Sequence, residues 1–461
     1  MKHYDAIVIG AGQAGTPLCR KLASSGLKTA LIEKRWVGGT CVNDGCSPTK
    51  AMVASAKAMW SARHNETLGV SAGAISIDFK KVMKRKDDIV HTMRGNSEKR
   101  ILDTKNLDLI YGTASFSAPK EVIVTLSDGS EETLSADQFF INTGLQPVIP
   151  EIVGIENVPY LTSTTILGLD TIPEHLLILG SGYIALEFGQ MFRRFGSKIT
   201  IIEPSGRILK REDEDIAAEV MKILAEEDIE VLTDSKAVKV ESTGSQITAW
   251  IESGESKRQI TCTHMLVAAG RRPQFASLNP ESAGIALNEK GYIQVNDYLE
   301  TSVKGIYALG DVKGGPAFTH ISYDDYRVIV NNVIEKKKAE SIRDRLVPYC
   351  MFIDPQLGRI GITEQEAKKQ GLDVKVAVLK NDSVARSIET GDERGMMKAV
   401  VDAKTGKILG AAVLAEQGGE IATILQMAMM GGIAYDRLMN GVFAHPTYAE
   451  SLNNLFMTLE G

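Results

Sequence analysis

The stretch GGTCVNDGCSPTK, residues 38–50, organises the interpretation of this chain of 461 residues. It places two cysteines, Cys41 and Cys46, between glycines. Pro48 suits the first turn of a helix, where its missing N–H removes a donor that would have no partner, and an alanine-rich run follows it. The pattern therefore predicts that Cys46 lies at or just before a helix N-terminus, where the helix dipole favours a thiolate.

Lys50 follows Cys46 by four residues, so a helix would bring its ammonium group to the same face and favour the thiolate further. A dithiol of this kind can alternate between a disulfide and a thiolate. A metal half-site usually has the spacing C-x2-C with a second pair elsewhere, whereas the remaining cysteines stand singly at Cys19, Cys262 and Cys350. Two buried structural thiols are the other alternative, but glycine-flanked cysteines suit a core poorly. The pattern favours a redox-active pair and no bound metal.

Composition and charge exclude several classes of protein. The chain is 44% hydrophobic and 24% charged, as globular proteins are, and it is long enough for two to four domains. The formal net charge of −6 gives no reason to expect nucleic acid or an anionic membrane as a partner. No apolar run reaches the length of a membrane span, and the first strand is broken by glycine too soon for a secretory signal. We therefore expect a cytoplasmic protein.

An apolar strand over residues 6–10 enters the glycine turn GAGQAG, residues 10–15, and a helix and a second strand follow. The three glycines, Gly10, Gly12 and Gly15, allow a tight turn, the approach of a pyrophosphate and close packing of helix on strand. The second strand ends in Glu33, which can accept hydrogen bonds from an adenosine ribose. Strand, glycine turn, helix, strand and acid in this order indicate a dinucleotide-binding module.

The same pattern occurs again between residues 176 and 203. A strand leads into GSGYIA, residues 180–185, and a helix and a strand that ends in Glu203 follow. Two modules imply two dinucleotides. Glu203 would accept the 2′-OH of NADH and repel a 2′-phosphate, whereas Arg207 offers a partner for NADPH, and we favour NADH.

The remaining segments predict further elements. A long charged helix is expected over 79–105, and strands over 109–111, 121–126 and 139–144. Short apolar strands at 265–270 and 306–311 end in Gly or Gly-Asp, and we expect both to return to the first sheet.

From about residue 347 the pattern changes to an antiparallel sheet, with strands expected at 349–353, 359–362, 375–379, 397–402 and 408–413. Two helices follow, over 419–430 and 447–457. We interpret the methionines of the first of these helices, Met427, Met429 and Met430, as a core or subunit-interface face rather than a metal site.

Taken together, these motifs resemble those of the class I pyridine nucleotide–disulfide oxidoreductases, a family that includes glutathione reductase, dihydrolipoamide dehydrogenase and mercuric reductase. The resemblance covers essentially the whole chain and includes Gly-Asp at 310–311 and His-Pro-Thr at 445–447. Within the family, residues 310–315, 321–327 and 445–456 are most similar to mercuric-reductase-like proteins, including the flavoprotein of bacterial reactive-chlorine resistance.

The resemblance implies an α/β fold with two Rossmann-like three-layer domains and a C-terminal α+β dimerisation domain. The expected domains are residues 1–147 for the first part of the FAD-binding domain, 148–264 for the NAD(P)-binding domain, 265–340 for the return to the FAD-binding domain and 341–461 for dimerisation. The family also implies a homodimer.

The family further implies FAD on the first module and NADH, with NADPH as the alternative, on the second. By resemblance, Cys46 is the thiol against the flavin and Cys41 the interchange thiol that faces the substrate. Lys50 and Glu187 resemble the ion pair beside flavin N5.

His445, oriented by Glu450, resembles the acid/base that reaches the dithiol of the partner subunit. Tyr183 resembles the residue that covers the flavin where the nicotinamide stacks. The implied cofactor-binding residues are Gly10, Gly12, Gly15, Glu33, Gly39, Thr40, Lys50, Thr143, Gly144, Gly180, Gly182, Tyr183, Glu203, Gly270, Gly310 and Asp311.

Asp44 and Ser47 depart from the family, which usually has apolar residues around the second cysteine, and we expect the carboxylate of Asp44 to oppose thiolate formation. The chain ends without the vicinal cysteine pair of mercuric reductases. We expect an NAD(P)H-dependent flavoenzyme that reduces a small disulfide or a metal ion through Cys41 and Cys46. The alternatives are a dihydrolipoamide dehydrogenase and, from another class, a flavin-binding redox sensor or NADH-binding interaction protein.

Overall fold

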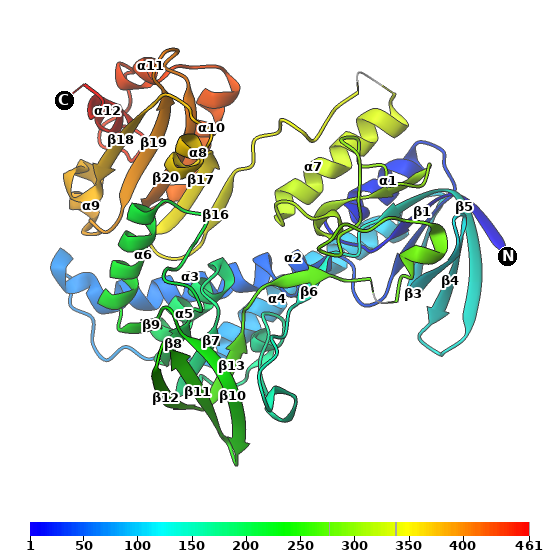
Figure 1. The fold of residues 1–461 in the computed structure, drawn as a ribbon, viewed down its shortest axis with the longest axis horizontal. Helices are drawn as coiled ribbons and strands as arrows, with labels where there is room; N and C mark the ends of the chain where they lie inside the picture. Colours follow the sequence, from blue (N-terminus) through cyan, green and yellow to red (C-terminus); the bar gives the residue numbers. More distant parts are fainter. Residues whose placement is uncertain (276, 337–338, 461) are drawn as a thin grey trace. The chain divides into compact units, whose positions relative to one another are not determined.

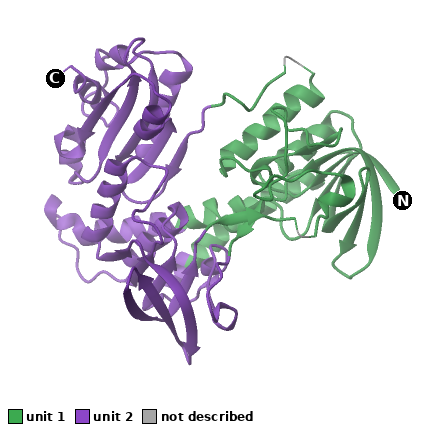
Figure 2. Ribbon diagram, viewed as in Figure 1, with its two compact units in different colours: residues 1–51, 83–148, 270–345 green, residues 52–82, 149–269, 346–461 purple. Residues whose placement is uncertain are grey.

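The computed structural model describes residues 1–275, 277–336 and 339–460, which form two compact units (Figures 1 and 2). The first unit contains residues 1–51, 83–148 and 270–345, and the second contains residues 52–82, 149–269 and 346–461. Each unit is thus assembled from three separate stretches of chain. The sheets and helices are mixed, and the α/β fold class is as predicted.

The first unit is built on a parallel sheet in the order β3-β2-β1-β5-β15. Strands β3 and β5 each continue into antiparallel pairing with β4, so a hairpin extends from the parallel sheet. The apolar residues of β1 are buried, as expected of a strand covered on both faces. The elements are β1 (Lys2–Ile9), α1 (Gly15–Ser24), β2 (Thr29–Glu33), α2 (Gly39–Asn43), α3 (Cys46–His64), α4 (Phe79–Leu102), β3 (Leu107–Ala118), β4 (Glu121–Leu126), β5 (Glu131–Ile141), β6 (Leu145–Pro147), β14 (Arg271–Pro273), β15 (Ile306–Ala308) and α7 (Thr319–Ile329), with α3 and α4 continuing into the second unit.

The second unit contains a parallel sheet, β13-β7-β8-β9, a three-stranded antiparallel sheet, β10-β11-β12, and a five-stranded antiparallel sheet, β16-β17-β20-β19-β18. Its elements are β7 (His175–Leu179), α5 (Tyr183–Phe195), β8 (Lys198–Ile202), α6 (Glu214–Glu226), β9 (Ile229–Leu232), β10 (Lys236–Thr243), β11 (Gln246–Ser253), β12 (Ser256–Cys262), β13 (His264–Val267), β16 (Tyr349–Met351), β17 (Gln356–Gly361), α8 (Glu364–Lys369), β18 (Val374–Lys380), α9 (Ala385–Thr390), β19 (Met396–Asp402), β20 (Ile408–Ala415), α10 (Gly418–Met430), α11 (Tyr435–Met439) and α12 (Ser451–Met457).

The first position of each glycine turn requires glycine, for the same steric reason in both units. Gly10 has φ of +100°, and a Cβ there would lie 2.3 Å from the carbonyl oxygen of Asn142, just after β5. Gly180 has φ of +103°, and a Cβ there would lie 2.6 Å from the carbonyl oxygen of Ala268, just after β13. Each turn therefore needs glycine to pass the end of the neighbouring parallel strand.

One prediction about strand placement is wrong. The segment expected over 265–270 in the first sheet forms β13, which pairs with β7 in the second unit. The segment expected over 306–311 forms β15 and does pair with β5 in the first sheet. Both are short apolar strands that end in glycine, so their pattern does not distinguish the two sheets. The chain returns to the first unit only at Gly270.

Other elements differ in their limits or were missed. Strand β4 has the predicted bounds, and the C-terminal sheet has the five predicted antiparallel strands. The last helix begins at Ser451 rather than at Thr447, because the Thr447 side chain and backbone form a turn with the N–H of Glu450. The short helix α2 and the sheet β10-β11-β12 were not predicted.

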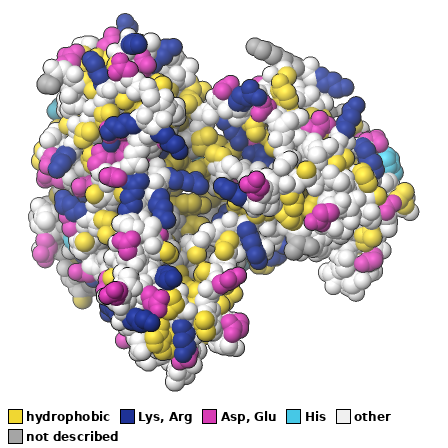
Figure 3. Space-filling model, viewed as in Figure 1, with side chains coloured by type: hydrophobic (Ala, Val, Ile, Leu, Met, Phe, Trp, Pro, Cys, Tyr) yellow, Lys and Arg dark blue, Asp and Glu magenta, His cyan; other side chains and the backbone are white. Residues whose placement is uncertain are grey.

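On the face that Figure 3 shows, basic and acidic side chains both occur throughout. Among the described residues, every helix falls short of the length or the apolarity that crossing a bilayer requires.

Candidate active site

Asn142, which the sequence analysis missed, holds the first glycine turn in place. Its buried amide accepts the N–H of Gly15 at 3.0 Å and donates to the carbonyl of Leu309 at 3.0 Å. A Cβ on Gly12 would lie 2.7 Å from its side-chain oxygen. The turn, the end of β5 and the end of β15 therefore converge at the carboxyl edge of the sheet, where dinucleotides bind in this type of fold.

Glu33, the last residue of β2, accepts backbone hydrogen bonds at this edge of the sheet. Its Oε2 accepts the N–H of Ala11 at 2.8 Å, and its Oε1 accepts the N–H of Arg35 at 2.8 Å. Thr143 directly follows Asn142 in the chain. Its hydroxyl is buried and has no hydrogen-bond partner among the described residues. A buried hydroxyl without a partner is costly, so it marks a place for a polar ligand group. These residues fit the adenine dinucleotide that the resemblance implies.

Asp311 follows β15, as predicted. Burial raises the pKa of its carboxyl group, and Arg271, with Nη1 3.4 Å from Oδ2, acts against that rise. The N–H of Gly310 is held by Asp325 Oδ2 at 2.8 Å. The carboxylate at this edge is thus poised to accept hydrogen bonds from a polyhydroxy chain.

Cys41 and Cys46 are carried by two consecutive helices. Cys41 lies inside α2, and Cys46 is the first residue of α3, so the predicted helix begins at the cysteine itself. A hydrogen bond with Cys46 and burial raise the pKa of Cys41, while a hydrogen bond with Thr319 and the charge of Lys50 act in the opposite direction. Cys41 therefore holds its proton at neutral pH and needs a base before it can act as a thiolate.

The hydroxyl of Thr319 lies 3.2 Å from Sγ of Cys46, although 273 residues separate them. Thr319 is the first residue of α7, so the N-termini of α3 and α7 both meet at this sulfur. A thiolate at Cys46 would accept the hydroxyl's hydrogen bond and would be favoured by both helix dipoles. No sequence motif pointed to Thr319.

Thr319→Val is expected to slow the alkylation of Cys46 by iodoacetamide at neutral pH about tenfold, because a hydrogen bond to a charged group is lost. The measurement is the alkylation rate of the reduced protein, followed by mass spectrometry. Thr319→Ser keeps the hydroxyl and should react like the wild type. Equal alkylation rates for the valine and serine variants would show that the Thr319 hydroxyl does not stabilise the thiolate of Cys46.

The carboxylate of Asp44, between the two cysteines, is paired with Arg35 and mostly buried. The adjacent Asn43 accepts a hydrogen bond from Arg94 Nε at 2.7 Å and donates to the carbonyl of Val37 at 3.0 Å. The expectation that Asp44 acts as an extra negative charge on the dithiol is therefore incomplete, because Arg35 compensates that charge.

Arg35→Gln is expected to destabilise the protein by about 1–2 kcal/mol, because it leaves the buried Asp44 carboxylate without a counter-charge. Arg35 is partly exposed, so solvent screening reduces the effect. Urea unfolding measures the loss. Asp44→Asn in the same protein should restore most of it, and additive losses in the double variant would show that the pair is not coupled.

In the second module, Glu203 follows β8, and both oxygens of its carboxylate accept hydrogen bonds. Its Oε2 accepts the hydroxyl of Ser181 at 2.5 Å, and its Oε1 accepts the N–H of Ser205 at 2.9 Å. Burial alone would raise the pKa of this carboxyl, but the hydrogen bonds from the two serines and the charge of Lys210 outweigh burial and lower it. Glu203 is thus ionised where a ribose would lie.

Helix α5 begins with Tyr183, which is 39% exposed, after Gly182 at the helix N-cap. Glu187, one turn further on, is buried, and its Oε1 accepts the N–H of Phe352 at 2.8 Å. Lys50 belongs to the first unit and Glu187 to the second, so their ion pair stays a prediction.

His445 and Glu450 form a close pair in the C-terminal part of the second unit. Nδ1 of His445 lies 2.9 Å from Oε2 and 3.1 Å from Oε1 of Glu450. The imidazole side chain is 68% exposed. The carboxylate fixes one ring nitrogen and leaves Nε2 available at the surface, as a general acid/base requires.

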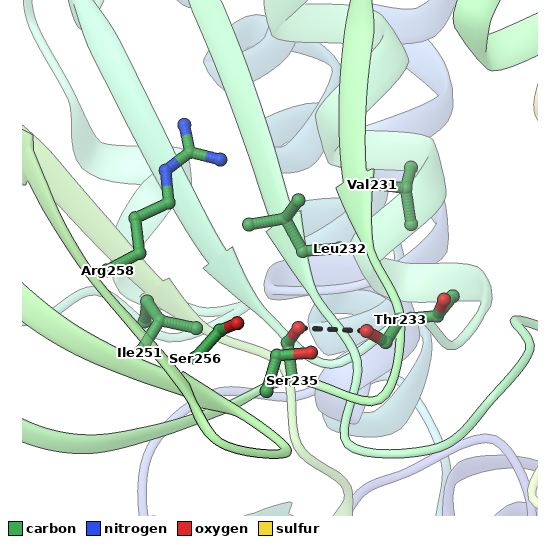
Figure 4. A pocket seen from close by; sticks show the side chains of 8 residues that line it. Val231, Leu232, Thr233, Ser235, Ile251, Ser256 and Arg258 are labelled. Carbon is green, nitrogen blue, oxygen red and sulfur yellow. Dashed lines mark hydrogen bonds between the residues drawn. The ribbon is translucent and has the colours of Figure 1, made fainter.

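A surface hollow of about 320 Å³ lies beside β9 and the hairpin of β11 and β12 (Figure 4). It contains none of the predicted site residues. Ser235 in its lining donates to the carbonyl of Thr233 at 2.8 Å, and Arg258 is paired with Glu230 at 2.8 Å. Because these polar groups have partners, we assign the hollow no role.

Two glycine turns at sheet edges and a thiol pair at a helix start define a flavin- and nicotinamide-dependent disulfide oxidoreductase. The sequence profile of the pyridine nucleotide-disulphide oxidoreductases matches residues 4–325, and the profile of their dimerisation domain matches residues 347–456. The chain belongs to this family, whose members are FAD-dependent enzymes that use a pyridine nucleotide.

Within the family, the chain is 38% identical over 459 residues to the probable pyridine nucleotide-disulfide oxidoreductase RclA of Escherichia coli, covering 99% of both chains. It is 35% identical to a mercuric reductase of Staphylococcus aureus, covering 99% of this chain and 82% of that protein. A dihydrolipoyl dehydrogenase of Thermus scotoductus is 34% identical, with 98% and 96% covered. The Cu(II) complex of RclA, the HOCl-induced flavoprotein disulfide reductase of E. coli, superimposes with a TM-score of 0.90 at 38% identity over 99% of each chain.

Proposed function

We propose that this chain uses NADH to reduce a metal ion, with a small disulfide as the second candidate acceptor, through the Cys41–Cys46 pair. The observation that carries the proposal is the thiol pair itself, with Thr319 and the N-termini of α3 and α7 at Cys46 and with the pKa of Cys41 raised by its hydrogen bond with Cys46 and by burial. When bound, FAD would relay two electrons from NADH to the Cys41–Cys46 disulfide.

Each residue of the site has a separate role in this reaction. Reduction breaks the S–S bond, and Cys41 takes up a proton while Cys46 retains the charge that Thr319 stabilises. Two Cu(II) ions that each take one electron, or one Hg(II) ion that takes two, would reoxidise the reduced pair to the disulfide, with release of the one proton that Cys41 holds. His445 would accept the proton of Cys41 as that thiol reacts, and Glu450 would orient the imidazole.

A metal ion is favoured as the acceptor because one of the solved relatives is a Cu(II) complex and several relatives are mercuric reductases. The small-disulfide alternative is favoured by the dihydrolipoyl dehydrogenases among the relatives. Here the metal is a substrate and not a resident cofactor.

We also propose a homodimer in which His445 serves the dithiol of the partner subunit. The match to the dimerisation domain supports it, and so do four exposed apolar side chains: Met427 and Met430 on α10, Ile433 three residues after it, and Val442 three residues before His445. Exposed apolar side chains of this size are typical of a subunit interface when they lie together.

The deciding experiment measures anaerobic NADH oxidation by the FAD-loaded protein with Cu(II), Hg(II), glutathione disulfide or lipoamide. The proposal expects metal-dependent oxidation that Cys41→Ser removes. Fast turnover with lipoamide would instead identify a dihydrolipoamide dehydrogenase. A biological effect that survives Cys41→Ser would favour the redox-sensor alternative.

Glu203→Gln is expected to raise the KM for NADH about tenfold and to lower the KM for NADPH, because the ionised carboxylate accepts the ribose 2′-OH and repels a 2′-phosphate. Steady-state kinetics with both cofactors check this. Glu230→Gln, at a surface carboxylate of β9 paired with Arg258, is the matched control. A protein that prefers NADPH before the substitution would contradict the assignment of NADH.

A further inference from the structure

The segment that would bind the adenosine half of NADH is held by the C-terminal sheet of the same unit. We call residues 203–213, between β8 and α6, the cofactor loop. Near its start, the hydroxyl of Ser205 donates to the carbonyl of Arg207 at 3.0 Å, and Arg207 Nη2 donates to the carbonyl of Lys210 at 3.1 Å. The same guanidinium lies 3.2 Å from Oε1 of Gln365 on α8. Arg207 is thus shared between the loop and the C-terminal domain.

The end of the loop is anchored by a buried carboxylate. Glu212 is 3% exposed, and its Oε1 accepts the hydroxyl of Tyr349 on β16. Its Oε2 lies 3.9 Å from Nε of Arg359 on β17, which is also 3% exposed. A buried carboxylate is stable only with such partners, so strands β16 and β17 fix this end of the loop.

The next residue makes a second anchor. Asp213 is 2% exposed and accepts the first backbone N–H groups of α8, from Glu364 and Gln365, each at 3.0 Å. Lys398 of β19, also 2% exposed, lies 3.4 Å from Asp213, 2.8 Å from Asp215 and 2.7 Å from Glu364. One buried ammonium therefore joins the start of α6 to α8 and to the C-terminal sheet.

We propose that Tyr349, Gln365 and Lys398 are positioning residues that set the affinity for the adenosine half of the nicotinamide dinucleotide, although none of them belongs to the glycine-turn module. This inference rests on the proposed function, which places that dinucleotide at Glu203. A loop held in its binding conformation loses less conformational freedom on binding, so releasing an anchor weakens the complex.

The test is calorimetric titration of the FAD-loaded protein with ADP-ribose, which reports the adenosine half alone. Tyr349→Phe and Lys398→Met are expected to weaken binding about tenfold, and the milder Gln365→Ala about threefold. Lys398→Arg keeps the charge and should bind ADP-ribose about as tightly as the wild-type protein does. Arg386→Gln, on the exposed surface of α9, is the matched control. Loss of an anchor should raise the KM for NADH and leave kcat at saturating NADH unchanged.

If Lys398→Met fails to fold, Tyr349→Phe and Gln365→Ala still decide the question, because Gln365 is exposed and phenylalanine keeps the tyrosine ring. Binding within twofold of the wild type in both of these variants overturns the inference. Failure of the wild-type protein to bind ADP-ribose would be a failure of the proposed function, so the two outcomes are distinguishable.

Discussion

Cys41→Ser is expected to lower acceptor-dependent NADH oxidation about 1,000-fold or more, while the protein stays folded and its FAD is still reduced by NADH. A serine hydroxyl can neither form a disulfide with Cys46 nor exchange with a substrate. The electron path would therefore stop at the flavin. Steady-state oxidation with Cu(II) measures the first effect, and stopped-flow absorbance of the flavin under anaerobic conditions measures the second.

Cys350→Ser is the matched control, because Cys350 is a half-buried cysteine outside the pair. It should leave turnover within about twofold of the wild type. If Cys41→Ser kept more than about a tenth of the activity, the acceptor would receive electrons directly from the flavin. The proposed role of the dithiol would then be wrong.

His445→Ala is expected to lower turnover about 100- to 10,000-fold, the usual contribution of a general acid or base. The pKa of Cys41 is raised by its hydrogen bond with Cys46 and by burial, so its thiolate fraction at neutral pH is small. That fraction grows as the pH rises. Without the imidazole, activity should therefore increase with pH through the alkaline range. Activity of the variant that stays flat with pH would contradict the role of His445 as the base.

Glu450→Gln should cost less, about tenfold, because the amide still accepts a hydrogen bond from Nδ1 but no longer stabilises the protonated ring. His91→Ala, at an exposed histidine on α4, is the control and should leave turnover unchanged.

A mixing experiment distinguishes a base supplied by the partner subunit from one supplied in the same chain. Cys41→Ser and His445→Ala are each nearly inactive. A hybrid dimer with one subunit of each has one intact site if His445 acts on the partner's dithiol, and none if it acts on its own. Equal mixing after dissociation should then restore about a quarter of wild-type activity. No recovery would place the base in the same chain as the thiols.

Several features could be predicted from the sequence because they depend on neighbouring residues alone. The glycine spacing of each turn can be recognised within six consecutive residues because the left-handed backbone of Gly10 and Gly180 favours glycine, although the carbonyl groups that these glycines pass belong to distant strands. Pro48 marks the start of α3 in a local way. The acid after each second strand follows from the length of a strand–turn–helix–strand unit. The fold class and the family follow from these local patterns, and both are confirmed.

The site contacts that sequence reasoning missed join residues that lie far apart in the chain. Thr319 meets Cys46, Asn142 binds Leu309, and Tyr349 binds Glu212 across 137 residues. None of these residues has a spacing or a motif of its own. The wrong prediction for β13, which was expected in the first sheet, has the same cause. Packing decides which strands pair, and the strand's own residue pattern does not.

By itself, the sequence determined that the chain has two dinucleotide turns, a thiol pair at a helix start and an acid that follows each module's second strand. The tertiary structure alone decided what surrounds those groups: the hydroxyl of Thr319 at Cys46, the charge of Arg35 on Asp44 and the C-terminal anchors of the cofactor loop. The physical reason is that turns and helix starts depend on local backbone geometry, whereas hydrogen bonds and ion pairs between distant segments form only when the packed core brings them together.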